Sequence, residues 1–500
     1  MAERTKRPNI IYFLVDNLGL GELGCYGGGI LRGTETLCLD RFAAEGIKLL
    51  NFAPEAQCTP SRSSLMTGRY AIRSGTHTVQ VAGSGCGIVA WERTIGDILS
   101  EAGYATCIVG KWHIGAEDGR WPTDHGFDEW YGIPHSYDEC LWADDPWYDP
   151  NRDPVSYVLK GHRGGGVHPV KQLTKEVRRN IDREYMSRAR AFLLRNVISC
   201  RPFFLYFCHS MMHYPTLPRE EFKGMTGNGD WADCLLEMDS DFGALLNYIK
   251  ALGVADNTIV VFSGDNGPEQ MGPWRGTAGF FEGSYFTGME GSLRTPCIIR
   301  FPGKVPPGLT SNEIVHITDM FSTLIRWAGC DIPNDRIIDG IDQREFLEGR
   351  KKQSRRVGFP FWTGPVLHGI KWRNFKMKRV LQQYLDSPAL SLPTPHIVNL
   401  LVDPKERESY DYPYIHTWVA AHIRNILRDF QESVKKEPLI PECAPLDYVP
   451  YPPTGSEFLE RIEIEREVAP ASPVLSRIRM RREDSPSEKA RFPHLSDVEP

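Results

Sequence analysis

Several features that would narrow the function of this 500-residue chain are missing from its sequence. No apolar run approaches the roughly 20 residues that cross a membrane as a helix, so we expect no membrane partner. The formal net charge is −6, which disfavours nucleic acid as a partner. The first residues, MAERTKRP, are polar and lead straight into an apolar run. Because they do not resemble a secretory signal, we expect a cytoplasmic protein.

The 12 cysteines include no Cys-x-x-Cys pair. This spacing counts against a zinc ribbon and against a thioredoxin-type redox site. In a cytoplasmic chain of this size, most of the thiols are expected to be reduced and to lie in the core. The chain also has no internal repeats, and 41% of its residues are hydrophobic. It is therefore long enough for one large core and a second, smaller unit.

Short, unbroken apolar runs are the clearest positive signal, and they occur over residues 9–19, 104–115, 202–215 and 257–267. Runs of this length that are rich in Ile, Val, Phe and Tyr indicate strands buried on both faces. Helical patterns lie between them, over residues 91–103, 183–196 and 233–253. This alternation predicts an α/β fold with a large doubly wound, mostly parallel sheet flanked by helices.

Each apolar run is followed by polar side chains, which are Asp16 and Asn17, Lys111 and His113, His209 and His213, and Asp265 and Asn266. In a parallel sheet the carboxyl ends of the strands meet at one edge, where ligands bind. Any one of these groups could simply form a turn. Four of them at the same edge predict a site for an ion or an anion.

After about residue 355, the alternation of long apolar runs and helical patterns gives way to short strand patterns. Short strand patterns over residues 357–362, 367–383 and 396–403 precede a helical pattern over 415–436. We therefore predict three parts: a catalytic α/β domain (1–355), a smaller antiparallel α+β subdomain (356–456) and a polar tail (457–500). The tail is rich in Arg, Glu, Pro and Ser, and we expect it to be extended or to form an oligomer contact.

The segment CTPSRSSLMTGR, residues 58–69, predicts a helix that begins directly after Cys58. Thr59 suits the N-cap, and Pro60 suits the first helical position. The free N–H groups and the positive end of such a helix attract anions and lower the pKa of a thiol. Arg62 can bind an oxyanion or pair with a carboxylate. A purely structural role, in which a capped helix follows a core thiol and Arg62 makes a surface ion pair, fits these residues equally well.

The same segment resembles the sulfatase signature, Cys-x-Pro-Ser-Arg followed by Leu-Met-Thr-Gly-Arg. In that family the cysteine is oxidised after translation to formylglycine (3-oxoalanine), by an enzyme that reads the Cys-x-Pro-x-Arg core. Further blocks similar to the family occur in the family's order: PNIIYFLVDNLG, GKWHIG, HYP and GDNGPE. The similarity runs from about Pro8 to the early 340s, and NLLVDPKERE resembles a C-terminal-domain segment. Related phosphatases of the alkaline-phosphatase superfamily carry Ser or Thr at the nucleophile, so Cys58 favours the sulfatase branch.

The resemblance implies a sulfuric ester hydrolase of the arylsulfatase type, which cleaves aryl sulfate monoesters to a phenol or alcohol and sulfate. One hydroxyl of the hydrated aldehyde at Cys58 attacks sulfur, and the second later expels sulfate. The implied partners are a small-molecule sulfate ester and the formylglycine-generating enzyme that matures Cys58. A homo-oligomer is left open.

The resemblance also implies the residues of the site. One Ca²⁺ or Mg²⁺ ion is bound by oxygen ligands from Asp16, Asn17, Asp265, Asn266 and the modified Cys58. The residues that hold the diol and the sulfate, or transfer protons, are Arg62, Lys111, His113 and His213. Of these, His213 is the expected general acid, and Ser136 corresponds to a serine that contacts sulfate in some members.

Two positions depart from the family pattern. The second of two successive aspartates is Asn17, and Tyr285 stands where a sulfate-binding lysine usually precedes the Glu of EGG-x-R. Tyr285 can donate a hydrogen bond to the substrate or form an aromatic wall. Because the two losses are opposite in charge, we expect them to compensate. Alternatively, Arg275 or Lys304 replaces the lysine.

Two other functions remain compatible with the sequence. The same scaffold could hydrolyse phosphonate monoesters or phosphodiesters. Because of the departures at Asn17 and Tyr285, the chain could instead be an inactive relative of the family that binds sulfated ligands.

Overall fold

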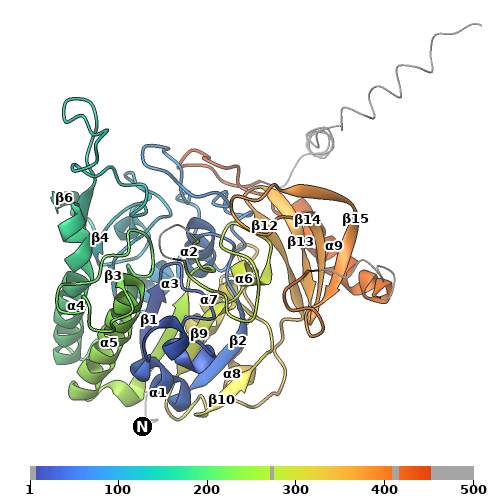
Figure 1. Cartoon of the computed structure of the whole chain (residues 1–500), viewed down its shortest axis with the longest axis horizontal. Helices are drawn as coiled ribbons and strands as arrows, with labels where there is room; N and C mark the ends of the chain where they lie inside the picture. Colours follow the sequence, from blue (N-terminus) through green and yellow to red (C-terminus); the bar gives the residue numbers. More distant parts are fainter. Residues whose placement is uncertain (1–6, 271–274, 408–415, 452–500) are drawn as a thin grey trace, which may run out of the picture. The chain divides into compact units, whose positions relative to one another are not determined.

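The computed structural model describes residues 7–270, 275–407 and 416–451. The predicted tail, residues 457–500, lies outside the described residues. The described chain contains a sheet of 11 strands with helices on both faces and a separate sheet of four strands (Figure 1). Both sheets belong to one compact unit that ends at Pro450.

The centre of the large sheet is parallel, as the apolar runs predict. Strand β1 (Asn9–Val15) lies between β7 (Phe203–His209) and β8 (Thr258–Gly264), and β3 (Ala105–Val109) pairs with the other side of β7. Antiparallel pairs appear only toward the edges of this sheet, at β8–β9, β9–β2, β4–β5 and β5–β6. The flanking strands are β2 (Ile47–Ala53), β4 (Glu129–Gly132), β5 (Tyr157–His162), β6 (Gly166–Gln172), β9 (Thr295–Arg300), β10 (Leu309–Ser311) and β11 (Val315–His316).

Side chains of β1 alternate between two helical layers because successive residues of a strand point to opposite faces. Ile11 and Phe13 pack in the core beneath α1 (Leu37–Glu45), α4 (Lys175–Ile198) and α5 (Asp230–Ala251). Ile10 and Tyr12 pack in the core beneath α2 (Cys58–Thr67), α3 (Ile95–Glu101), α7 (Ile317–Trp327) and α8 (Arg344–Leu347). The two-layer burial explains why the central strands read as continuous apolar runs.

The smaller sheet is antiparallel, also as predicted. Its strands, in spatial order, are β12 (Gly358–Thr363), β13 (Val366–Trp372), β14 (Phe375–Leu381) and β15 (Leu390–Asn399). Helix α9 (Ala420–Lys436) packs on β13 through Ile370, Val419 and Ile423. The short helix α6 (Glu290–Leu293) immediately precedes β9 of the large sheet.

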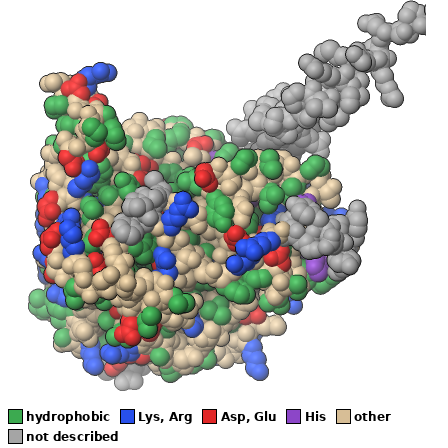
Figure 2. All heavy atoms as spheres, viewed as in Figure 1, with side chains coloured by type: hydrophobic (Ala, Val, Ile, Leu, Met, Phe, Trp, Pro, Cys, Tyr) green, Lys and Arg blue, Asp and Glu red, His purple; other side chains and the backbone are tan. Residues whose placement is uncertain are grey.

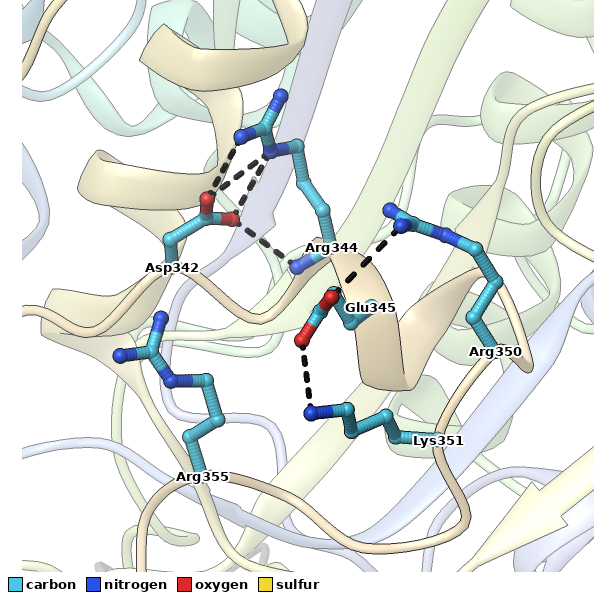
Figure 3. Close-up of a pocket in the computed structure, with 6 residues that line it drawn as sticks. All are labelled: Asp342, Arg344, Glu345, Arg350, Lys351 and Arg355. Atoms are coloured by element: carbon cyan, nitrogen blue, oxygen red, sulfur yellow. Dashed lines mark hydrogen bonds and ion pairs between the residues drawn. The ribbon is translucent and has the colours of Figure 1, made fainter.

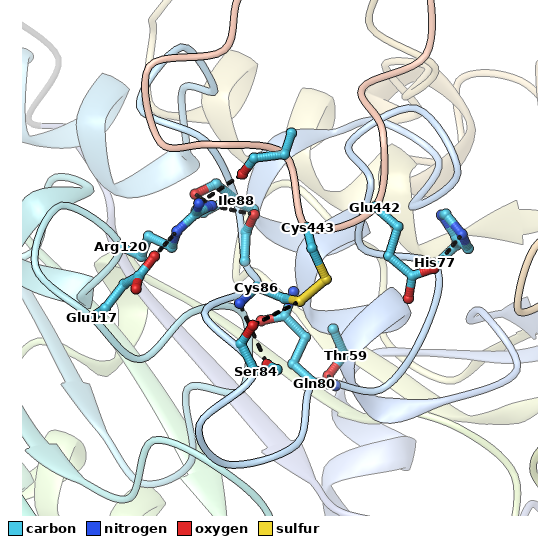
Figure 4. The surroundings of a disulfide bond; sticks show 12 residues. Thr59, His77, Gln80, Ser84, Cys86, Ile88, Glu117, Arg120, Glu442 and Cys443 are labelled. Carbon is cyan, nitrogen blue, oxygen red and sulfur yellow. Dashed lines mark hydrogen bonds and ion pairs between the residues drawn. A yellow bond between two sulfur atoms is a disulfide. The ribbon is translucent and has the colours of Figure 1, made fainter.

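The segment that follows α9, residues 437–450, returns to the large sheet, and we call it the C-terminal strap. A disulfide joins Cys443 of the strap to Cys86 (Figure 4). The guanidinium of Arg120 donates to the Ala444 carbonyl at 2.8 Å. Disulfide bonds are rare in proteins of reducing compartments. The disulfide therefore counts against the cytoplasmic location expected from the first residues.

Two surface properties bear on possible partners. Among the described helices, none combines the length and the apolar composition needed to cross a membrane. On the face shown in Figure 2, acidic and basic side chains are interspersed.

Candidate active site

The carboxyl ends of β1 and β8 bring Asp16 and Asp265 together beside Cys58, the first residue of α2. One ligand atom from each of these three buried residues lies within 4.8 Å of the others. Asn17 follows in a left-handed conformation, with φ 54°, and its backbone N–H donates to Asp265 Oδ1 at 3.1 Å. Strand ends that are far apart in sequence thus form one compact polar centre.

Two buried cations balance the paired carboxylates. Arg62 Nε and Nη2 both donate to Asp265 Oδ2, at 3.1 and 2.8 Å. Lys111, just beyond β3, donates from Nζ to Asp16 Oδ2 at 3.0 Å. Burial raises the pKa of Asp16, but the charges of Lys111 and Arg62 hold it well below its usual range. Burial and the neighbouring charge of Asp16 raise the pKa of Asp265.

The amide side chains complete an oxygen-rich cradle. Asn266 Nδ2 donates to Asn17 Oδ1 at 2.7 Å, and Asn17 Nδ2 donates to Glu269 Oε2 at 2.6 Å. The side-chain oxygen of Asn266, Oδ1, is buried without a hydrogen-bond partner. A buried acceptor of this kind carries a desolvation cost unless something binds it. Carboxylate and amide oxygens of this arrangement fit a hard divalent cation.

Helix α2 begins at Cys58, two residues before the predicted first helical position at Pro60. Gln57, in an extended conformation, is the N-cap, so Thr59 lies inside the first turn. Its hydroxyl donates instead to the His113 carbonyl at 2.9 Å. The predicted lowering of the thiol pKa is also wrong: burial outweighs the nearby Lys111 cation and raises the pKa of Cys58 to about 12. The thiol is therefore neutral at physiological pH.

A hydrogen-bonded chain links Lys111 to His213 through Ser136. Lys111 Nζ donates to Ser136 Oγ at 3.0 Å, and Ser136 Oγ lies 2.8 Å from His213 Nε2. The other ring nitrogen, Nδ1, lies 2.7 Å from the Tyr214 carbonyl, to which it donates. Burial lowers the pKa of His213, but nearby carboxylates, Asp138 foremost, raise it more strongly. His213 is thus disposed to carry a second proton.

Tyr285 reaches the same centre. Its side chain is buried, and the charges of Glu269 and Asp138 add to burial in raising the pKa of its hydroxyl. The two cations considered as replacements for the missing lysine, Arg275 and Lys304, are both exposed. Neither of them therefore folds into this buried centre.

His113 lies at one side of the centre and is fully enclosed. Its Nε2 is 3.1 Å from the Gln80 carbonyl and 3.4 Å from Glu139 Oε1. Burial, assisted by the Lys111 cation, lowers the pKa of His113 to about 4. The ring is therefore neutral at physiological pH.

The structure brings together the residues that the resemblance implies for the site, whereas His209, which the strand pattern grouped with them, lies elsewhere. His209 Nε2 lies 3.3 Å from Asp241 Oδ2 within the core, so this histidine does not join the site although it ends a predicted strand. Sequence reasoning missed Glu269 and Glu139. Glu269 ends the block GDNGPE, and Glu139 lies three residues after Ser136, so both stand close to residues already assigned to the site. Their acidic side chains were the available signal.

A surface pocket of about 640 Å³ is lined by residues outside the site. Its cations are largely paired within the pocket, as between Arg344 and Asp342 at 2.8 Å and Lys351 and Glu345 at 3.3 Å (Figure 3). These pairings leave the buried centre as the better candidate for catalysis.

Comparisons with known proteins identify the family. Residues 8–330 match the family described as sulfatase, and residues 276–429 match the C-terminal region of N-sulphoglucosamine sulphohydrolase. N-acetylgalactosamine-6-sulfatase of Canis lupus familiaris is 33% identical over 387 residues, covering 74% of this chain and 71% of the relative. Arylsulfatase A of Homo sapiens is 34% identical over 370 residues, covering 72% of this chain and 71% of the relative.

A solved structure gives the same result. The PsFucS1 sulfatase from Pseudoalteromonas sp. superimposes with a TM-score of 0.82 and 29% identity, over 88% of this chain and 93% of that one. The chain therefore belongs to the sulfatase family, within the alkaline-phosphatase superfamily, and is a hydrolase of sulfate esters.

Proposed function

We propose that the chain is a formylglycine-dependent sulfatase that acts on aryl sulfates. The observation that carries the proposal is the state of Cys58, a neutral buried thiol among the ligand atoms of Asp16 and Asp265. A thiol that stays protonated is a weak nucleophile. Conversion of Cys58 to a hydrated aldehyde would place an oxygen nucleophile at the same position.

We assign the oxygen cradle to one Ca²⁺ or Mg²⁺ ion. Asp16, Asn17, Asp265 and Asn266 would hold it, and the unpartnered Asn266 Oδ1 supports this assignment. When bound, the ion stabilises negative charge on the nucleophile and on the sulfuryl oxygens. It also relieves the repulsion between the two buried carboxylates.

The remaining polar side chains position the substrate and move protons. Lys111 and Arg62 present cationic N–H groups to the sulfuryl oxygens, in a water-poor site where such contacts are strong. His113 and Ser136 orient the nucleophile and the sulfate. His213 is the general acid, which donates its Nε2 proton to the departing oxygen.

The preference for aryl sulfates rests on Tyr285. The resemblance places a lysine there in relatives, where it helps the leaving group. With a tyrosine, that work falls to His213 alone. A phenol leaves more readily than a sugar alcohol because its pKa is near 10, as in tyrosine. The site is thus better suited to phenol leaving groups.

A substrate panel tests this proposal. Matured enzyme should hydrolyse nitrophenyl sulfate faster than N-acetylgalactosamine 6-sulfate, the substrate that the canine relative's name specifies. Phosphonate monoester and phosphodiester analogues should be slower still. The variant Cys58→Ala serves as the blank. A faster rate on the sugar sulfate would refute the aryl preference, and a faster rate on the phosphorus esters would refute the proposed reaction.

A further inference from the structure

A second cluster of metal-binding side chains lies beside the proposed Ca²⁺ or Mg²⁺ site and has a different chemistry. One ligand atom each from His113, His135 and Glu139 lies within 4.8 Å of the other two. We propose that these three residues form a separate site for a transition-metal ion such as Zn²⁺. Binding of the ion does not depend on the sulfatase mechanism, and only the inhibition expected from it rests on the proposed function.

The geometry converges on the carbonyl oxygen of Gln80. His113 Nε2 lies 3.1 Å from that oxygen and 3.4 Å from Glu139 Oε1. His135 offers a ligand atom to the same cluster, and its ring plane is nearly perpendicular to that of His113. Two imidazoles and one carboxylate are the protein ligands of many zinc sites that keep a fourth position open. The Gln80 carbonyl, or a water molecule, is available for that position.

The ligand atoms must move closer to hold an ion, since Zn²⁺ binds nitrogen at about 2.0–2.1 Å. Three of the four groups permit a small movement. Glu139 and His135 are only partly buried, and Gln80 belongs to a loop, residues 76–87, which has no helix or strand. His113 and Gln80 are both buried. The site can therefore close around an ion held first by His113.

The protonation states of the cluster already suit a metal. Burial lowers the pKa of both His113 and His135, so both rings are neutral at physiological pH. Burial raises the pKa of Glu139, but the hydrogen bond from His113 brings it well below its usual range. Neutral imidazole and ionised carboxylate are the forms that bind metals. In addition, Nδ1 of both histidines is buried without a hydrogen-bond partner.

The two neighbouring sites should select different ions. The cradle around Asp16 and Asp265 offers oxygen, which favours Ca²⁺ and Mg²⁺, whereas imidazole favours Zn²⁺. Binding of Zn²⁺ through His113 Nε2 would leave the ring proton on Nδ1 and fix the tautomer. Because His113 is also assigned to the active centre, occupancy should inhibit the enzyme.

Isothermal titration with Zn²⁺ tests the site directly. The titration uses the Cys58→Ala/Cys200→Ser background, which removes the thiol of the proposed active centre and the exposed thiol, in buffer saturated with Ca²⁺. We expect one Zn²⁺ per chain. His135→Ala and Glu139→Gln should each weaken binding more than roughly tenfold, since loss of a ligand exceeds the loss of an outer-shell partner.

The matched control is His168→Ala, which removes an exposed histidine from β6. This control should bind Zn²⁺ as tightly as the background, and circular dichroism should show that all variants are folded. The proposal fails if His135→Ala and Glu139→Gln bind Zn²⁺ as tightly as the control. It also fails if Ca²⁺ displaces the ion. In the matured enzyme that retains Cys200 and carries the aldehyde at position 58, Zn²⁺ should inhibit hydrolysis, and His135→Ala should require about tenfold more Zn²⁺ for the same inhibition.

Discussion

At Asn17, a negative charge that relatives are expected to carry on a metal ligand is replaced by a neutral amide. The structure places another carboxylate directly behind it, because Asn17 Nδ2 donates to Glu269 Oε2 at 2.6 Å. That hydrogen bond fixes the amide so that its oxygen faces Asn266. If Asn17 and Tyr285 compensate as we expect, Glu269 is a third residue of that compensation.

Replacing this amide tests the role of Glu269. Asn17→Asp should weaken Ca²⁺ binding by about tenfold, because the new carboxylate would abut that of Glu269. The double variant Asn17→Asp/Glu269→Gln should recover the affinity, since a donor again faces an acceptor. Titration calorimetry with Ca²⁺ measures both. Tighter binding by the single variant would show that added ligand charge outweighs the repulsion.

The pKa of His213 predicts the alkaline limit of activity. Because nearby carboxylates raise this pKa despite burial, the imidazolium should persist above the ordinary value near 6.5. The general acid is then lost only at higher pH, so kcat should fall on the alkaline side. His213→Gln should remove that limb from the pH profile. Asp138→Asn should shift the limb to lower pH; an unshifted limb would contradict the assignment.

Individual site residues were predictable where a strand end supplied them. Asp16, Lys111 and Asp265 follow apolar runs, and parallel pairing brings such positions together. Glu269 and Glu139 were not predicted because an acidic residue in a loop is usually solvated, and only folding buries Glu269 and partly buries Glu139. The thiol pKa of Cys58 was predicted in the wrong direction because helix-end electrostatics can be estimated from sequence but desolvation cannot.

Among the elements, α2 depends on a buried carboxyl beneath it. Glu55 Oε1 accepts from Ser64 Oγ at 3.0 Å and from the Ala71 N–H at 3.4 Å. Burial raises the pKa of Glu55 to about 7. The folded state therefore binds this proton more tightly than the unfolded state. Its contribution to stability is present below pH of about 4.5 and is lost as pH rises toward about 7.

Glu55→Gln should remove this pH dependence while keeping the hydrogen bonds. We expect the difference in unfolding free energy between variant and wild type to grow by up to about 3 kcal/mol from pH 5 to pH 8, in favour of the variant. Urea unfolding at the two pH values measures it. Parallel pH dependence in both proteins would mean that Glu55 does not control it.

The elements differ in how well the sequence defines them. The central strands and the helices α3 and α5 were located within a few residues because burial and periodicity are strong there. The flanking strands β2, β4, β5, β6, β9, β10 and β11 were not predicted. Where such a run is short or part-exposed, as in β4, β5, β6 and β10, it resembles a loop. The pairing of Cys86 with Cys443, 357 residues apart, is set by tertiary structure alone.

At the scale of the whole molecule, a buried charge network joins the two sheets. Glu290, at the start of α6, accepts from Lys371 Nζ at 2.6 Å and lies 3.2 Å from Lys376 Nζ. Arg294 pairs with the same carboxylate. Burial and the Arg294 cation lower the pKa of Lys371 to about 7. Glu290 is thus the shared counter-ion of three cations.

Removing the shared counter-ion should be far worse than removing one cation. Glu290→Gln leaves buried cations unbalanced, and such changes cost about 3–5 kcal/mol. Lys371→Met removes a group that is already partly neutral, and it should cost clearly less. Thermal unfolding of both variants gives the comparison. Equal losses of Tm would show that the network is not organised around Glu290.

The account as a whole requires that Cys58 is the precursor of the nucleophile. Mass spectrometry of the tryptic peptide 49–62, after co-expression with a formylglycine-generating enzyme, tests this most directly. We predict that the thiol is replaced by an aldehyde, seen as loss of the CH₂SH group and gain of CHO. The fraction converted should set the specific activity on nitrophenyl sulfate. A fully active enzyme whose peptide still carries the thiol would contradict the account.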